Sequence, residues 1–97
     1  MIVEVECLPT PPGTDASPYA HVEAAIAVIQ GSGLSYEVSA LGTTFEGAPD
    51  QLWPIVRGVH EACLGAGARS VVTIIKAFES SREDGPTMTS LTSKFRS

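Results

Sequence analysis

The sequence has 97 residues and a formal net charge of −5, and its hydrophobic fraction of 43% is typical of a globular domain with one modest core. Its six Lys and Arg residues cannot supply the basic footprint that a phosphate backbone requires, so the composition argues against nucleic-acid binding. No apolar run approaches the roughly 20 residues of a membrane span, and the first residues lack the pattern of a signal peptide, so we expect a cytoplasmic protein without membrane contact.

The first predicted strand covers residues 2–8, where apolar and more polar residues alternate until Pro9 ends the pattern. Its clean apolar face consists of Val3, Val5 and Cys7. Residues 10–15 show no periodicity and are rich in turn residues, which is typical of a loop.

The first predicted helix begins at Ser17 and Pro18, a hydroxyl cap followed by proline at the first helical position. Its apolar stripe follows the helical spacing i, i+3, i+4 and i+7, with Val22, Ala25, Ile26 and Ile29. The glycines of residues 31–33 end the helix.

Residues 34–47 predict a β-hairpin on which the candidate site depends. Apolar and polar residues alternate from Leu34 to Ala40, and the alternation resumes after Gly42, so the turn falls at residues 40–42.

A second helix opens at residues 48–50, and we expect Pro54 to delay or distort its first turn. Its stripe consists of Leu52, Ile55, Val56, Val59 and Cys63. Residues 69–78 are β-branched and apolar, which predicts a last strand covered on both faces.

The predicted order is strand, helix, strand, strand, helix, strand, which is the ferredoxin-like βαββαβ arrangement of the α+β class, an antiparallel sheet with both helices on one face. We expect a single domain over residues 1–97, in which residues 79–97 form a C-terminal extension with a short helix that docks on its own sheet or on that of a neighbour. Apolar residues also fall on the uncovered sheet face: Ile2, Leu8, Val72, Ile74 and Phe78. This pattern favours sheet-to-sheet packing in an oligomer.

Strand parity also predicts a cluster of carboxylates and hydroxyls on the open face. If Tyr36 and Phe45 point toward the helices, the side chains that point away from them are Glu4, Glu6, Glu37, Thr44, Glu46 and, from the last strand, Lys76. Carboxylates in a partly desolvated pocket can hold a cationic or amino-bearing heterocycle through charge-assisted hydrogen bonds. The alternative is an ordinary solvated sheet face with a weak Glu–Lys pair.

The histidines and cysteines predict neither a metal site nor a disulfide. His21 and His60 lack nearby partners at the spacing of metal ligands, and Cys7 and Cys63 are too far apart for a CxxC motif. We therefore expect buried thiols. The sequence also lacks a phosphate loop, a Ser-His-Asp arrangement and an HExxH motif.

Several stretches together resemble the small thiamine-binding (YkoF-like) proteins. The hairpin carries the family's tyrosine-glutamate, threonine and glutamate-glycine pattern in Tyr36-Glu37 and in residues 42–47. The resemblance extends to the Ser17-x-Tyr19 helix start, to residues 60–62 of the second helix and to the last strand. It covers essentially the whole chain.

This resemblance implies a homo-oligomer, a dimer or tetramer, that binds thiamine or its hydroxymethylpyrimidine part without catalysing a reaction and needs no other cofactor. The implied pocket lies on the open sheet face near the oligomer interface, where carboxylates suit the aminopyrimidine and the thiazolium cation. The predicted ligand-binding residues are Glu37, Ser39, Thr43, Thr44, Glu46 and Lys76.

Two other functions fit the same order of elements. One is a small ferredoxin-like enzyme of the dimeric α+β barrel or acylphosphatase type, although the loop over residues 8–15 contains no Arg or Lys that could form a phosphate cradle. The other is a structural or regulatory oligomerisation module.

Overall fold

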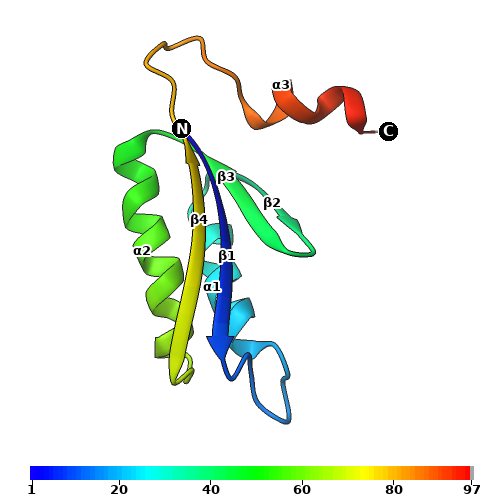
Figure 1. Ribbon diagram of the computed structural model, residues 1–97, viewed down its shortest axis with the longest axis vertical. Coiled ribbons are helices and arrows are strands. Elements are labelled where there is room, and N and C mark those ends of the chain that lie inside the picture. Colours follow the sequence, from blue (N-terminus) through cyan, green and yellow to red (C-terminus); the bar gives the residue numbers. More distant parts are fainter. Residues whose placement is uncertain (97) are drawn as a thin grey trace.

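The computed structural model describes residues 1–96 as an antiparallel sheet with two long helices on one face and a short helix near one end (Figure 1). The elements are β1 (Ile2–Thr10), α1 (Ala20–Gln30), β2 (Ser35–Ser39), β3 (Gly42–Glu46), α2 (Pro49–Gly65), β4 (Ser70–Phe78), α3 (Met88–Thr92) and a 3-10 turn (Ser93–Phe95). The strand order is β2-β3-β1-β4. The predicted ferredoxin-like fold is confirmed.

The strand register confirms which residues share the open face. Glu4 lies opposite Thr44 on β3 and opposite Lys76 on β4, and Thr44 in turn lies opposite Glu37 on β2. These four residues therefore form one row across the sheet. In the neighbouring row, Val3 and Phe45 at the centre of the sheet are fully buried against the helices.

The core lies between the sheet and the two long helices. The predicted α2 stripe is buried at Leu52, Val56, Val59 and Cys63. Helix α1 buries Ala25 and Ile29 but leaves Val22 and Ile26 only half-buried. Among residues 1–96, no helix is long and apolar enough to cross a membrane.

The predicted start of the first helix needs correction, whereas the predicted start of the second helix at residues 48–50 is confirmed. Helix α1 begins at Ala20 rather than at Ser17, because residues 14–17 close a turn in which the Thr14 hydroxyl accepts a hydrogen bond from the Ser17 amide at 3.1 Å. The His21 ring then holds the loop against the helix through a 2.6 Å hydrogen bond between its Nδ1 and the Pro11 carbonyl oxygen. Helix α2 begins at Pro49, so Pro54 does not delay it.

Strand β1 is longer than the hairpin beside it, and this difference creates a notch. Its pairing with β4 continues to Thr10 and Ser70, whereas its pairing with β3 stops at Val5 and Thr43. In the part of the chain that the structure describes, no strand pairs with β1 on the hairpin side beyond Val5. The backbone edge of β1 is therefore open from Glu6 onward.

Candidate functional site

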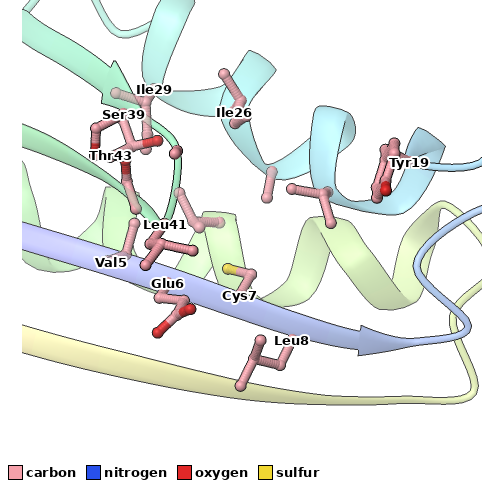
Figure 2. Close-up of a pocket in the computed structure, with 15 residues that line it drawn as sticks. Val5, Glu6, Cys7, Leu8, Tyr19, Ile26, Ile29, Ser39, Leu41 and Thr43 are labelled. Carbon is pink, nitrogen blue, oxygen red and sulfur yellow. Dashed lines mark hydrogen bonds between the residues drawn. The ribbon is translucent and has the colours of Figure 1, made fainter.

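A cavity of about 290 Å³ occupies this notch, between β1, α1 and the tip of the β2–β3 hairpin (Figure 2). We call it the notch cavity. Its lining is mostly apolar and includes Val5, Val22, Ala25, Ile26, Ile29, Leu41 and Val59. Small-molecule sites are typically concave, apolar and furnished with a few polar groups, and this cavity matches that description.

The polar groups of the notch cavity come from three separate segments. Figure 2 shows Ser39 and Thr43 at the hairpin end of the cavity, Glu6 and Cys7 on β1, and Tyr19 at the far end beside the start of α1. Thr43 is only 4% exposed, so its hydroxyl lies inside the molecule rather than on its surface. The Ser39 hydroxyl donates a 2.9 Å hydrogen bond to the Gly42 carbonyl, which tightens the turn.

The open edge of β1 adds backbone hydrogen-bonding groups to the same cavity. A strand edge presents N–H and C=O groups that have no partner strand. Because Glu6, Cys7 and Leu8 of this open edge line the cavity, those groups face a partly desolvated space in which hydrogen bonds are stronger than in water. A planar heterocycle with ring nitrogens and an amino group can pair with such an edge.

The predicted site residues divide among three places. Ser39 and Thr43 line the notch cavity. Thr44 and Lys76 belong to the exposed row on the open face, where Glu4 accepts a 3.5 Å hydrogen bond from Thr44 and lies 3.6 Å from the Lys76 ammonium. Such an exposed ion pair contributes little stability.

Glu37 and Glu46 occupy the third place, beneath the C-terminal segment. Arg96 forms an ion pair with Glu37, and the Glu46 carboxylate accepts a 2.9 Å hydrogen bond from the Met88 amide. The hydrogen bond from Arg96 to Glu37 raises the pKa of the guanidinium above its usual range. A second cavity, of about 320 Å³, lies between these carboxylates and α3. The carboxylates thus already contact a cation and an amide donor of their own chain.

Polar side chains of α2 and β4 form hydrogen bonds with one another next to the notch cavity. The Thr73 hydroxyl lies 2.6 Å from His60 Nδ1 and 3.8 Å from the Cys7 sulfur. Burial, with a smaller contribution from the Cys7 thiol, raises the pKa of Cys63 to about 11. Cys63 is therefore a protonated thiol at neutral pH and a poor nucleophile.

A comparison with known protein families matches residues 3–96 to the family described as thiamine-binding protein. The chain belongs to this family.

Known relatives and solved structures agree with the family and with the fold. A UPF0045 protein of Clostridium perfringens is 34% identical over 82 residues, which span 84% of each chain. A domain of unknown function (DUF77) from Bacillus cereus is 36% identical with a TM-score of 0.79, over 99% of this chain and 91% of that one. A proposed thiamine biosynthesis/salvage protein of Thermotoga maritima is 24% identical with a TM-score of 0.74, over 99% of this chain and 100% of that one, and this match shows the fold alone.

Two of the segments that resemble other thiamine-binding proteins meet at the notch cavity. Tyr19 comes from the Ser17-x-Tyr19 helix start, and Thr43 comes from the hairpin motif. The two segments are far apart in sequence, and the fold brings both to one space.

Apart from Ser39 and Thr43, the predicted site residues did not include the lining of this cavity, for example Tyr19 and Leu41. One signal was available in the sequence. The apolar alternation of the first strand continues past the length of either hairpin strand, so part of its edge had to lie outside the hairpin.

Proposed function

We propose that this protein binds thiamine or its hydroxymethylpyrimidine part in the notch cavity and does not transform it. The observation that carries the proposal is the cavity itself. It combines an apolar lining, a buried hydroxyl and an open strand edge, and segments that resemble the thiamine-binding family form its walls.

The chemistry of the lining suits the two halves of thiamine differently. The flat faces of an aminopyrimidine fit between aliphatic side chains such as Val22 and Leu41, while its amine and ring nitrogens pair with Thr43 and the β1 edge. The thiazolium carries a fixed positive charge, but the Glu6 side chain points to the open face of the sheet, on the same side as Glu4 and Leu8. The pyrimidine half therefore has more complementary groups in this cavity than the thiazolium half.

The open sheet face offers a second place for the same ligand. Glu37 and Glu46 flank the cavity beneath α3, and two carboxylates would suit a cationic or amino heterocycle. A ligand there must displace Arg96 and the Met88 amide, whereas the notch cavity requires no such exchange. We therefore rank the notch cavity first.

The proposal includes self-association and a cytoplasmic location. The open face exposes Leu8, Val72, Ile74 and Phe78, and a second copy that covers these side chains would remove apolar surface from water. A dimer or a tetramer would satisfy this requirement.

Isothermal titration with thiamine, hydroxymethylpyrimidine and choline tests the proposed function. We expect the first two ligands to bind, and we expect their affinity to change only modestly with added salt, because a partly enclosed site is screened less than an exposed one. Equal and salt-sensitive binding of thiamine and choline would contradict a specific cavity. Chromatography of the ligand after long incubation tests for turnover, and a new product would support the alternative of a small enzyme.

A further inference from the structure

The end of the chain, residues 87–96, forms an arm that leaves its own apolar side chains uncovered. In Figure 1 the arm stands off the sheet at the end where β1 begins and β4 ends. Leu91 is 52% exposed and Phe95 is 77% exposed. The Cα radius of gyration is 14.1 Å, whereas a compact domain of this length has a value of about 12.5 Å.

The arm is also opposite in charge to the rest of the chain. Its only charged residues are Lys94 and Arg96, whereas the chain as a whole carries a net charge of −5. Arg96 is paired with Glu37, but Lys94 has no carboxylate partner within residues 1–96 and lies 5.0 Å from the centre of the Phe95 ring. The arm therefore presents an apolar and basic surface to its surroundings.

The open sheet face is complementary to that surface. Near the end of the sheet remote from the arm it exposes Leu8, Val72 and Ile74, all of them apolar. Glu6 lies opposite Ile74 in the same region and has no ion-pair partner in the described part of the chain. The region is thus apolar and acidic, where the arm is apolar and basic.

A chain cannot bring its own arm to this region while the arm keeps its contacts. Glu46 holds the arm beside Ile2, at the start of β1. Leu8 lies six residues farther along the strand, a distance of about 20 Å at the usual rise per residue. The geometry points to the open face of a second copy as the partner of the arm. In this arrangement, Leu91 and Phe95 of one chain contact Val72 and Ile74 of the other.

This inference rests on the proposed self-association and is independent of ligand binding. The interface between two chains would then consist of the arm as well as the sheet, rather than of sheet-to-sheet packing alone. The inference also assigns a role to Glu37 and Glu46, which hold the arm in position for a second chain.

Sedimentation equilibrium of full-length variants tests the arm. The arm variant carries Leu91→Gln and Phe95→Gln, and the face variant carries Val72→Thr and Ile74→Thr, which keep strand propensity. The control carries Trp53→Gln and Leu64→Gln on α2, where the native side chains are 49% and 44% exposed. All six positions are at least partly exposed, so we expect folded proteins, and circular dichroism verifies this.

We expect the arm and face variants each to raise the dissociation constant by at least about tenfold, as for the loss of central apolar contacts in an interface. The control should match the wild type. A variant that combines the arm and face changes should lose less free energy of association than the sum of the losses in the two separate variants, because both sets of changes remove the same contact. A wild-type oligomer that is insensitive to the arm changes, or fully additive effects, would overturn this inference alone. A monomeric wild type would overturn the proposed self-association as well.

Discussion

Thr43 and Thr44 are neighbours in sequence, yet their hydroxyls lie on opposite faces of the sheet. Thr43 lines the notch cavity and is almost fully buried, whereas Thr44 lies on the open face and donates to Glu4. Strand geometry causes this division, since successive side chains point to opposite faces. Substitutions at these two neighbouring residues can therefore distinguish a ligand in the notch cavity from a ligand on the open face.

Thr43→Val should weaken the binding of thiamine and of hydroxymethylpyrimidine by about tenfold, because one buried hydrogen bond to a ligand is worth roughly 1.4 kcal/mol. Valine has nearly the same shape, so the cavity keeps its size. Isothermal titration measures the effect. Thr44→Val is the matched control and should bind both ligands as the wild type does. If only Thr44→Val loses affinity, the ligand binds on the open face.

Glu37→Gln and Glu46→Gln should leave thiamine affinity unchanged when the ligand occupies the notch cavity. Instead, each change should loosen the arm, because Glu37 pairs with Arg96 and Glu46 accepts from the Met88 amide. Limited trypsin digestion followed by mass spectrometry measures faster cleavage after Lys94. Weaker thiamine binding by both variants, with a normal Thr43→Val protein, would place the ligand beneath α3.

The alternation of side chains along the strands predicted the residues of the open face correctly, because the buried core fixes which side chains point toward the helices. Val3 and Phe45 are fully buried, so their neighbours Glu4, Thr44 and Glu37 had to point the other way. Such an inference needs only the period of the strands and one buried face.

The notch cavity could not be found in this way. It arises from the unequal lengths of β1 and β3, and its walls come from distant segments that contain Tyr19, Leu41 and Thr43. The contact between Glu37 and Arg96 could not be predicted from the sequence either, because a single ion pair between residues 59 positions apart leaves no periodic pattern. Hydrophobic periodicity predicts faces of elements, whereas these features depend on where elements end.

The stability of the protein should fall between pH 9 and pH 11 because of Cys63. Burial raises the pKa of this thiol from an ordinary value of 9.0 to about 11, so the unfolded chain releases the proton first as pH rises. The raised pKa therefore stabilises the fold below pH 9, and this contribution is lost as pH approaches 11, by at most about 3 kcal/mol. Urea unfolding at pH 8 and pH 10.5 measures the loss. Cys63→Ala should be less stable at pH 8 but should lose less stability between the two pH values, and an equal loss in both proteins would contradict the assignment.

Gly13→Ala should destabilise the fold and weaken ligand binding together. A Cβ atom at Gly13 would lie 2.3 Å from the Ser17 carbonyl oxygen and 2.4 Å from the Pro18 carbonyl carbon, both of them backbone atoms that cannot move aside alone. The loop must therefore shift, and it leads directly to Tyr19 at the end of the notch cavity. We expect the free energy of unfolding to fall by about 1–3 kcal/mol, as for other strained backbone positions.

Gly65→Ala is the matched control for this loop prediction. Gly65 ends α2, and a Cβ atom there would meet nothing within 4 Å. Alanine favours a helix by up to about 1 kcal/mol over glycine, so this variant should be at least as stable as the wild type and should bind thiamine equally well. Both variants replace glycine by alanine, and urea unfolding and ligand titration should show losses of stability and affinity in Gly13→Ala but not in Gly65→Ala. A Gly13→Ala protein with wild-type stability and reduced affinity would show that the loop positions Tyr19 without contributing to the fold, whereas a destabilised protein with unchanged affinity would remove Tyr19 and its loop from the site.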